Sequence, residues 1–594
     1  MSAFLPAAHA QRKVAAAAPA ATGSAGAVPV TTSSGTSSSE EVVQLSPFQV
    51  AAEADRGYQA LNTLSGTRLN SKLEDLGSSI TVVTMQQMQD LAVSDLNDVF
   101  LFEASTEGTE NFTQFTPNRN GGVGDNVSSD PARANRIRGV GSAGTSGSGV
   151  NVAFGNRAVN TKIPVDLYNI DAIEISRGPN SNLFGLGASA GTINLVPSQA
   201  NLNRQTASVA FRFDDRGGHR ESLNLNRPIL PGKLAARVAA VHESKGFERK
   251  PSSERIDRLY ATVSAKPFKN TLINASYEKY ENFYRRPNSL MPRDTTVEWR
   301  AAGQPTWDPT TQMVTFANGT RTGPFPVGSG ATAENTVLPA GLFPGGNLYT
   351  RRIAYIENNQ VQYLGVGRTG NPITTGTPSP LTNNSNLRLL ETGTDLMRNK
   401  ATKYPLFFQT AVRDQSIYDW TEINYVAPNY GEDSAKTMAV DLEQTFFRNS
   451  EHLIAGRVGW FRQEFQRDSR YYIESTDTVI YVDVNEKLLD GTPNPYFKRP
   501  YVQTVGPIRV RTPEISDTQS ADLAYQFSPQ RLPKFLSWIG TQRLGGHWET
   551  VRYDTVNYRY APHIADNHAW INSTNRTAPA QIMQRFCVGD ANGQ

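Results

Sequence analysis

The chain has 594 residues with 58 basic and 55 acidic side chains, and its formal charge of +3 gives no electrostatic case for a nucleic-acid partner. A single cysteine, Cys587, excludes an internal disulfide framework and a cysteine-based zinc site, and the seven histidines include no HExxH or HxH motif. No apolar run approaches the roughly 18 residues of a membrane-spanning helix, but spanning strands alternate in polarity and fit the mean hydropathy of −0.45.

The N-terminal fifty residues lack the composition of a folded core. Residues 1–10 have no basic n-region, but they end in the A-x-A form of a signal-peptide cleavage site, so we interpret them as the remnant of an export signal. A chance alanine-rich start is the alternative. Residues 11–40 have almost no large apolar side chains and are predicted to form a disordered tether. Residues 41–50 form a short apolar island, in which Pro47 opposes a helix.

Residues 77–197 are predicted to form a compact unit of mixed helices and strands. The alternating, β-branched run at 78–84 indicates a strand, and Thr84 followed by Gln87 has the capping-box pattern of a helix start. Ser94 is predicted to cap a second helix. The apolar side chains expected to form the buried stripe of that helix are Leu96, Val99 and Phe100.

A glycine-rich segment, IEISRGPNSNLFGLGASAGTINLV at 173–196, closes this unit. Its residues 185–190 match G-x-G-x-x-A, which would indicate a dinucleotide-binding turn and an oxidoreductase. That turn needs a helix after the glycines, whereas residues 192–196 are strand-like and precede Pro197. We therefore prefer a backbone role, with turns and close approaches that only glycine tolerates. The chain also has no nucleophile elbow or phosphate-binding loop, so no enzyme is predicted.

Beyond residue 203 the chain changes to segments of period two. Apolar and polar side chains alternate at 206–213, 258–265 and 437–443, and turn residues separate the successive segments, which predicts antiparallel hairpins. Aromatic residues near the strand ends fit the interfacial girdle of a membrane barrel and fit the core of a soluble sandwich equally well.

A stretch at about 295–399 is rich in Gly, Pro, Thr and Asn and is predicted to be a long loop region. Soluble domains rarely carry so much irregular chain, whereas outer-membrane barrels carry it on their outer side. Aromatic side chains in or near this stretch are candidates for stacking on a sugar-like solute or for packing the loops. They are Trp299, Trp307, Tyr349 and Tyr355.

Three segments, in this order, resemble the plug domain of the TonB-dependent outer-membrane receptors. Residues 78–100 resemble its opening strand and two helices, residues 136–141 its Ile-Arg-Gly motif, and residues 170–196 its Arg-Gly-Pro turn and glycine-rich strand. The motif residues are Arg138, Gly139, Arg177, Gly178, Pro179, Gly185, Gly187, Gly191 and Asn194. The rest of the chain agrees in its alternating strands but carries no motif of comparable specificity.

The resemblance implies an α+β plug domain at 77–197 followed by an antiparallel transmembrane β-barrel, which has about 22 strands in the family. Residues 204–594 would be the N-terminal part of that barrel. The resemblance also implies the outer membrane of a Gram-negative-type envelope, with membrane lipid and an extracellular solute as partners. It implies no catalytic residue, no cofactor and no metal.

The resemblance assigns residues 41–50 to a TonB box. Such a box is an exposed strand that adds to the sheet edge of TonB, which ExbB and ExbD energise in the periplasm. The box residues would be Glu41, Val42, Val43, Gln44, Leu45, Ser46, Pro47 and Phe48. The alternative is that these residues merely pack on the plug.

The resemblance also assigns partners to two plug arginines. Arg138 and Arg177 would pair with glutamates on the inner barrel wall, where charge-assisted contacts are stronger than at an open surface. Glu443 and Glu464 are candidate partners, between which the sequence does not select.

We therefore predict a receptor for the energy-coupled uptake of a bulky, scarce solute, with siderophores, cobalamin and oligosaccharides all open. The chain ends in polar residues, and the residues after the plug leave room for only half to two thirds of the barrel strands of the family. We therefore predict a truncated copy that lacks residues at both termini. The alternative function is a secreted β-rich surface or adhesion protein that binds ligand without transport. It accounts for the strands and loops but not for the ordered plug motifs.

Overall fold

The structure is a computed structural model of the chain. All described residues fall within one compact unit, residues 45–594. The described residues are 47–48, 57–65, 67–93, 95–108, 115–117, 123–125, 136–141, 150–178, 190–287, 293–294, 296–324, 347–349, 352–358, 360–366, 389–391, 419, 422–473, 479–488, 491–504, 508–529, 540–560 and 582–588. The predicted export-signal remnant and tether lie outside them.

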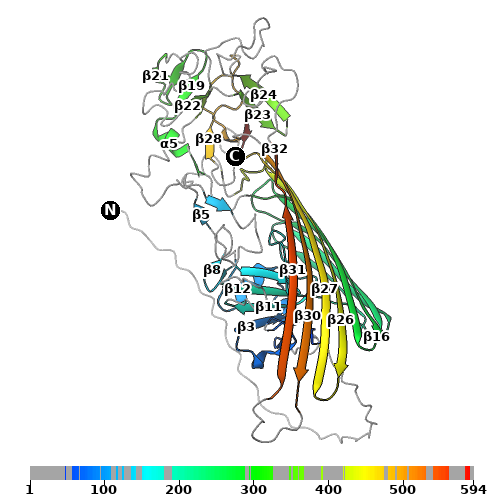
Figure 1. Ribbon diagram of the computed structural model, residues 1–594. Helices are drawn as coiled ribbons and strands as arrows, with labels where there is room; N and C mark the ends of the chain where they lie inside the picture. Colours follow the sequence, from blue (N-terminus) through cyan, green and yellow to red (C-terminus); the bar gives the residue numbers. More distant parts are fainter. Residues whose placement is uncertain are drawn as a thin grey trace, which may run out of the picture. The chain divides into compact units, whose positions relative to one another are not determined.

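A five-stranded mixed sheet with two short helices occupies the predicted compact region and is termed the plug unit (Figure 1). Its strands are β3 (Ile80–Thr84), β9 (Val150–Phe154), β10 (Arg157–Ala158), β11 (Ile170–Arg177) and β12 (Gly191–Pro197), in the order β10-β9-β12-β11-β3. β12 pairs antiparallel with β11 and parallel with β9. The predicted strand at 192–196 is confirmed, and the helix that a dinucleotide-binding turn requires is not there.

Two helices, α1 (Met85–Asp90) and α2 (Leu96–Phe102), pack against this sheet. The predicted stripe of α2 is buried, which confirms the helical period. The shared core consists of Val83, Met88, Leu96, Val99, Phe100, Ile137, Val150, Val152, Leu167, Ile170, Ile173, Ile175, Ala190, Ile193 and Leu195. Within the described part of the chain, no helix has the length and apolarity needed to cross a membrane.

Side-chain caps fix where the two helices begin. Thr84 Oγ1 accepts a hydrogen bond from the backbone N of Gln87 at 3.2 Å, as predicted. The predicted Ser94 cap is wrong by one residue. The N-cap of α2 is Asp95, whose carboxylate accepts from the backbone N of Asp98 at 3.0 Å. A carboxylate at this position also interacts favourably with the positive end of the helix dipole.

Short ladders accompany the plug sheet. They are β1 (Asn62–Thr63) with β2 (Ser71–Lys72), β4 (Thr106–Glu107) with β7 (Arg136–Ile137) and β8 (Val140–Gly141), and β5 (Phe115–Pro117) with β6 (Val123–Asp125). One 3-10 turn, η2 (Leu73–Asp75), follows β2.

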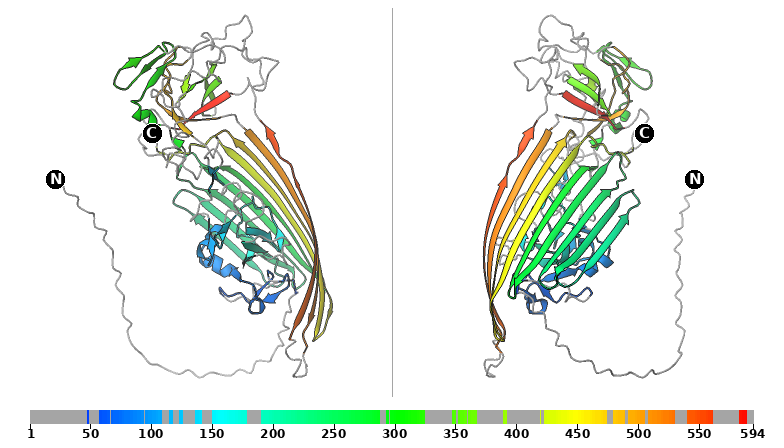
Figure 2. Two further views of the ribbon diagram at one scale, coloured as in Figure 1. Left: turned by 60° about the vertical axis from the view of Figure 1, so that its left-hand side comes forward. Right: turned by 90° about the vertical axis from the view of Figure 1, so that its right-hand side faces the viewer.

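The long strands beyond residue 203 form one curved antiparallel sheet, termed the strand wall (Figure 2). Its strands are β13 (Thr206–Phe213), β14 (His219–Leu230), β15 (Leu234–Lys245), β16 (Ser253–Phe268), β17 (Thr271–Arg285), β26 (Tyr430–Arg448), β27 (His452–Tyr471), β30 (Ile508–Phe527), β31 (Gln542–Thr555) and β32 (Tyr558–Tyr560). Each strand pairs with the next in this order, except that β31 and β32 both pair with β30. All three segments predicted from alternation lie in these strands.

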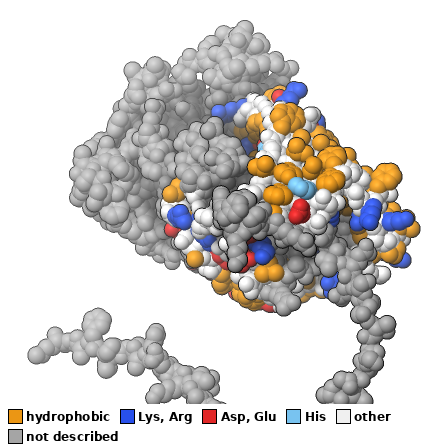
Figure 3. All heavy atoms as spheres, turned by 60° about the horizontal axis from the view of Figure 1, so that its bottom comes forward, with side chains coloured by type: hydrophobic (Ala, Val, Ile, Leu, Met, Phe, Trp, Pro, Cys, Tyr) orange, Lys and Arg blue, Asp and Glu red, His pale blue; other side chains and the backbone are white. Residues whose placement is uncertain are grey.

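The strand wall is polar on its buried face and apolar on its exposed face. Along β16, Arg258, Tyr260 and Thr262 are buried and define the inner face, whereas Leu259 and Val263 are 43% and 42% exposed on the outer face. Other exposed apolar residues of the outer face are Leu225, Val238, Tyr277, Val440, Leu442, Val458 and Leu523. Figure 3 shows broad areas of hydrophobic side chains on one described surface. A soluble sandwich buries its apolar face, so this arrangement indicates a sheet that faces hydrocarbon.

In the parts that the structure describes, the stretch at 295–399 contains short regular elements, which its composition does not predict. It contains α5 (Thr296–Ala301), β19 (Thr306–Asp308), β20 (Met313–Thr315), β21 (Arg321–Thr322), β22 (Asn347–Tyr349), β23 (Arg352–Glu357), β24 (Gln360–Val366) and β25 (Leu389–Glu391). β23 and β24 join a six-stranded sheet with β18 (Arg293–Asp294), β28 (Val479–Val482), β29 (Pro500–Gln503) and β33 (Ile582–Cys587). β19, β20 and β21 have only two or three residues each, too few for a period of two to be recognised. β23 also pairs with β33, a partner far along the chain.

Three of the four aromatic residues near this stretch pack the loops. Trp299, Trp307 and Tyr355 are at most 6% exposed, and the two tryptophans share a cluster with residues of β28 and β29. The packing interpretation is therefore confirmed for these three. The side chain of Tyr349 lies outside the described part of the structure.

Candidate functional site

The plug unit meets the inner face of the strand wall through ion pairs and hydrogen bonds. Asp166 of the plug unit lies between two wall arginines, with Oδ1 2.7 Å from Arg220 Nη2 and Oδ2 3.7 Å from Arg258 Nε. Arg258 also donates to the Pro164 carbonyl at 2.6 Å and lies 3.3 Å from Glu278. One plug carboxylate and one plug carbonyl are thus held by β14 and β16.

The charges around Asp166 keep this contact ionised. Burial alone would raise the pKa of Asp166, but the positive charges of Arg258 and Arg220 outweigh it and hold the pKa below its usual value. The contact is therefore present above the usual aspartate pKa of about 3.9 and is lost only as the pH falls through the lowered value. Nearby, the Tyr168 hydroxyl donates to Glu278 at 2.9 Å, and burial together with that negative charge raises the pKa of Tyr168.

A second group of contacts joins the residues after β9 to β26 and β30. Arg157 makes a two-point ion pair with Asp441, and Lys162 makes an ion pair with Glu514. Gly459 of β27 lies beside the first pair, where a Cβ atom would collide with the Arg157 guanidinium and the Asp441 carboxylate. The missing side chain makes room for the plug arginine to reach the wall.

A third group lies near the end of the plug unit. Arg237 Nη1 is 3.3 Å from Asp171 Oδ1, and the Tyr260 hydroxyl donates to the Ser198 carbonyl at 2.9 Å. The three groups together draw on β14, β15, β16, β17, β26 and β30 of the wall. Polar contacts of this kind can be exchanged for contacts with water at small net cost, unlike a buried apolar core.

A buried carboxylate inside the plug unit holds the chain that enters from the N-terminus. Glu174 on β11 is 1% exposed. Thr63 Oγ1 and Ser65 Oγ donate to its two oxygens at 2.6 and 2.5 Å, and the backbone N of Leu64 donates at 3.0 Å. Asn194 Nδ2 donates a fourth hydrogen bond at 2.7 Å, so this predicted motif residue orients the carboxylate. Thr63, Leu64, Ser65, Glu174 and Asn194 are termed the Glu174 latch.

The structure describes only the last two residues of the predicted TonB box. Residues 41–46 lie outside the described part of the structure, and their role stays a prediction. Pro47 and Phe48 are described, and Phe48 is 2% exposed, packed on Leu69 and on alanines of β27 and β30. Phe48 is therefore an anchor on the wall in this structure and not part of an exposed strand.

The structure contradicts the expected pairing of Arg177 with the barrel wall. Its Nη2 lies 3.4 Å from Glu103 and donates to the Ala104 carbonyl at 2.9 Å, and its Nη1 donates to Thr81 Oγ1 at 2.5 Å. All of these partners belong to the plug unit. The reason is that β11 ends beside the C-terminal end of α2, where unpaired carbonyls and the helix dipole attract a cation.

The Arg138-Gly139 motif forms a turn between β7 and β8. Both residues have a positive φ, 54° for Arg138 and 72° for Gly139, as a tight hairpin turn requires. The backbone N of Arg138 donates to the Ser105 carbonyl at 2.8 Å. Its side chain is exposed and makes no ion pair with any residue that the structure describes, so the expected wall partner is not found among them.

The two candidate wall glutamates point to opposite faces. Glu443 is buried on the inner face, in register with Arg457 of β27. Glu464 lies on the outer face, 2.9 Å from Arg462 on the same strand. Among the ion pairs of the described residues, Arg177 pairs with Glu103 and Glu464 pairs with Arg462. Because side chains alternate between the two faces of a strand, Glu464 is excluded as an inner-wall partner.

The described glycines of the last motif act through their backbones. Gly178 and Gly191 have φ values of 99° and 148°, and a Cβ atom on Gly191 would collide with the Ser176 carbonyl oxygen across the β11–β12 ladder. Pro179, Gly185 and Gly187 lie outside the described residues. Close strand pairing, and not phosphate binding, accounts for Gly191.

Replacing Gly191 with alanine is expected to destabilise the plug unit by at least about 2 kcal/mol, because the new Cβ adds a backbone collision to an unfavourable φ. Limited proteolysis of the purified protein measures this as faster cleavage within the plug unit. Gly77→Ala is the matched control, since no atom lies within 4 Å of its added Cβ. Equal cleavage rates for the two variants would contradict this role of Gly191.

Comparison with known proteins gives one family model and several relatives. Residues 72–192 match the TonB-dependent Receptor Plug Domain. The metal-pseudopaline receptor CntO of Pseudomonas aeruginosa is 29% identical over 228 residues, which cover 36% of this chain and 29% of the relative. The chain thus spans less than a third of the length of that curated relative.

Solved structures of two receptors are similar to this chain at low sequence identity. BauA, the ferric preacinetobactin receptor from Acinetobacter baumannii, matches with a TM-score of 0.46 and 10% identity, covering 84% of this chain and 51% of that structure. The pyoverdine outer membrane receptor FpvA from Pseudomonas aeruginosa matches with a TM-score of 0.39 and 14% identity, covering 88% of this chain and 64% of that structure.

Proposed function

Because residues 72–192 are a TonB-dependent receptor plug domain, the chain belongs to the TonB-dependent receptors of the outer membrane, and we propose that it serves the energy-coupled uptake of a scarce, bulky solute. The observation that carries this proposal is the contact between plug unit and strand wall. Asp166, Arg157 and Lys162 bind the wall through polar pairs, which can be broken and remade without exposing an apolar core. A plug unit that must move relative to the strand wall needs a polar contact of this kind.

In the proposed cycle, TonB, energised by ExbB and ExbD, pairs with residues 41–46 and pulls. The pull passes along the chain to Thr63 and Ser65. Both side chains donate hydrogen bonds to Glu174, which lies on the interior strand β11 of the plug sheet. Force therefore acts first on the wall contact of Phe48, next on the Glu174 latch, and last on the wall contacts of Asp166, Arg157 and Lys162. No covalent step is involved.

The solute class that we propose is a metal ion held in an organic chelator. The support is the name of the relative CntO, a receptor for metal-pseudopaline. Cobalamin and oligosaccharides, which the sequence left open, have no comparable support. The buried positions of Trp299, Trp307 and Tyr355 also leave them unavailable for stacking on sugar rings.

Transport by the whole-length receptor in a Gram-negative host without its own chelate receptors tests this function. Radiolabelled metal chelate should accumulate in the cells, and a protonophore that dissipates the energising gradient should stop the accumulation. Labelled cobalamin is the control solute and should not accumulate. Accumulation of no labelled chelate above the vector control, or accumulation that the protonophore leaves unchanged, would contradict the proposal.

Cell fractionation separates the receptor from the adhesion protein. We expect detergent-extracted material from the outer membrane whose electrophoretic mobility changes on heating, as closed barrels show. Freely soluble protein with full ligand binding would favour the adhesion protein instead.

A further inference from the structure

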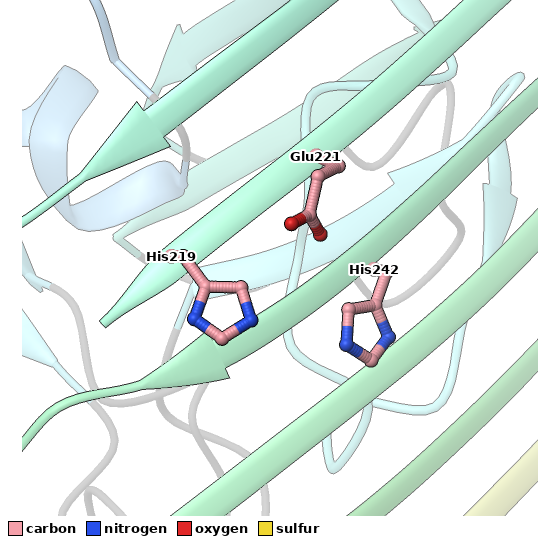
Figure 4. A group of neighbouring side chains, drawn as sticks. All are labelled: His219, Glu221 and His242. Atoms are coloured by element: carbon pink, nitrogen blue, oxygen red, sulfur yellow. The ribbon is translucent and has the colours of Figure 1, made fainter. Parts of the chain in front are cut away.

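We propose that His219, Glu221 and His242 form a binding site for one divalent transition-metal ion of the Zn²⁺ type, on the outer face of the strand wall (Figure 4). Their ligand atoms all lie within 4.8 Å of one another. Two imidazoles and one carboxylate are an established ligand set for zinc with an open fourth position. A nitrogen-rich set also favours Zn²⁺, Cu²⁺, Ni²⁺ and Co²⁺ over Mg²⁺ and Ca²⁺.

Strand geometry brings the three side chains together. His219 and Glu221 alternate with Arg220, which points to the inner face and contacts Asp166 of the plug unit, so both flanking residues point outward. Glu221 is in register with His242 on the neighbouring strand β15. The Glu221 carboxylate points toward the space between the two imidazole rings, whose centroids are 6.1 Å apart (Figure 4).

Asp257 of β16 orients one of the histidines. It is in register with His242, and its Oδ1 lies 2.6 Å from His242 Nδ1. A carboxylate on Nδ1 leaves Nε2 free and makes it a better ligand, which is the usual support of a metal-bound histidine. Two ligand atoms of a tetrahedral ion lie about 3.4 Å apart, so side-chain movements of about 1 Å complete the site. The side chains of His242 and Asp257 are 44% and 45% exposed, which leaves them free to make that movement.

His219 is the first residue of β14 and His242 lies three residues before the end of β15, so the cluster lies at one edge of the strand wall and not in its hydrocarbon-facing middle. A shallow hollow of about 470 Å³ lies beside the cluster and leaves the fourth coordination position open to water or to a small ligand at this edge. Its polar wall includes Glu221, His242 and Asp257. Its apolar wall includes Val209, Phe211, Leu223 and Leu259. The site is independent of the transport function, because none of its residues contacts the plug unit in the described structure.

Metal titration of the purified whole-length receptor in detergent, after removal of bound metal by a chelator, tests the site. The wild-type protein should bind one equivalent of Zn²⁺ that His219→Ala/His242→Ala lacks, and Co²⁺ should give visible absorption bands that the same double variant loses. His242→Ala alone should weaken Zn²⁺ binding at least tenfold, and Asp257→Asn should weaken it about tenfold by removing the orienting carboxylate.

His452→Ala is the matched control, because His452 lies on β27, stacked on Phe527, away from the three proposed ligands. It should leave the Zn²⁺ affinity unchanged. Heat-modifiable mobility checks that each variant is folded, and Glu221→Gln, with an expected loss of at least tenfold, replaces any histidine variant that is not. Equal Zn²⁺ stoichiometry and affinity in the wild-type protein and in the folded variants would overturn the proposal.

Discussion

Removing residues 41–46 from the whole-length receptor is expected to abolish energy-coupled uptake while solute binding stays unchanged. The physical reason is that strand addition to TonB requires an extended segment of several residues, and this is the apolar segment nearest to the plug unit. The deletion retains Pro47 and Phe48, because Phe48 is buried against the strand wall and its removal would disturb the plug directly. Parallel uptake and binding assays with one labelled chelate measure the two effects separately.

The matched control is a deletion of six residues within the tether, at 21–26, which shortens the chain by the same length. Uptake should survive in this control, because a flexible tether of slightly shorter reach still spans to its partner. Uptake at the wild-type rate after removal of 41–46 would show that the box lies elsewhere. Loss of uptake in both deletions would show that tether length matters and not the apolar segment.

Glu174→Ala is expected to destabilise the attachment of residues 62–65 by about 3 kcal/mol, because it removes a buried acceptor and leaves several donors unpaired. Amide exchange in this segment and in β11 should accelerate about 100-fold, as measured by hydrogen-exchange mass spectrometry. Uptake should fall at least tenfold with binding retained, since the pull no longer reaches the centre of the plug sheet.

Two variants sharpen the test of Glu174. Glu74→Ala removes a carboxylate that is 72% exposed and paired with Lys72, and it should leave exchange and uptake unchanged. Glu174→Gln retains the shape and one acceptor, so we expect an intermediate acceleration of exchange. If amide hydrogen exchange in the Glu174→Ala variant is as slow as in the Glu74→Ala variant, the proposed role of the Glu174 latch in transmitting force to the plug sheet is contradicted.

Sequence patterns within a few residues correctly predicted those helices and strands that depend mainly on neighbouring residues. The cap at Thr84, the buried stripe of α2 and the strand at 192–196 follow from rules that act within a few residues. The Ser94 cap failed because Asp95 is an equally good cap one position later, and the sequence does not rank adjacent cap formers.

Contacts between distant segments escaped prediction. The donors of Glu174 lie up to 111 residues away, and the partners Arg157 and Asp441 are 284 residues apart. The family resemblance assigned Arg177 to the wall, but the nearby end of α2 offers it a closer set of acceptors. His219 and His242 belong to no histidine motif of fixed spacing, because the sheet register brings them together across two strands.

The measurement that tests the central claim most directly is the electrical conductance of the whole-length receptor in planar lipid bilayers. If the plug unit is a stopper inside a transmembrane barrel, the intact receptor should conduct almost no current. A variant lacking residues 72–192, with heat-modifiable mobility as proof of its folded barrel, should form large, stable channels. An intact receptor that conducts as well as this variant, or a folded variant that conducts no better than the intact receptor, would contradict the claim.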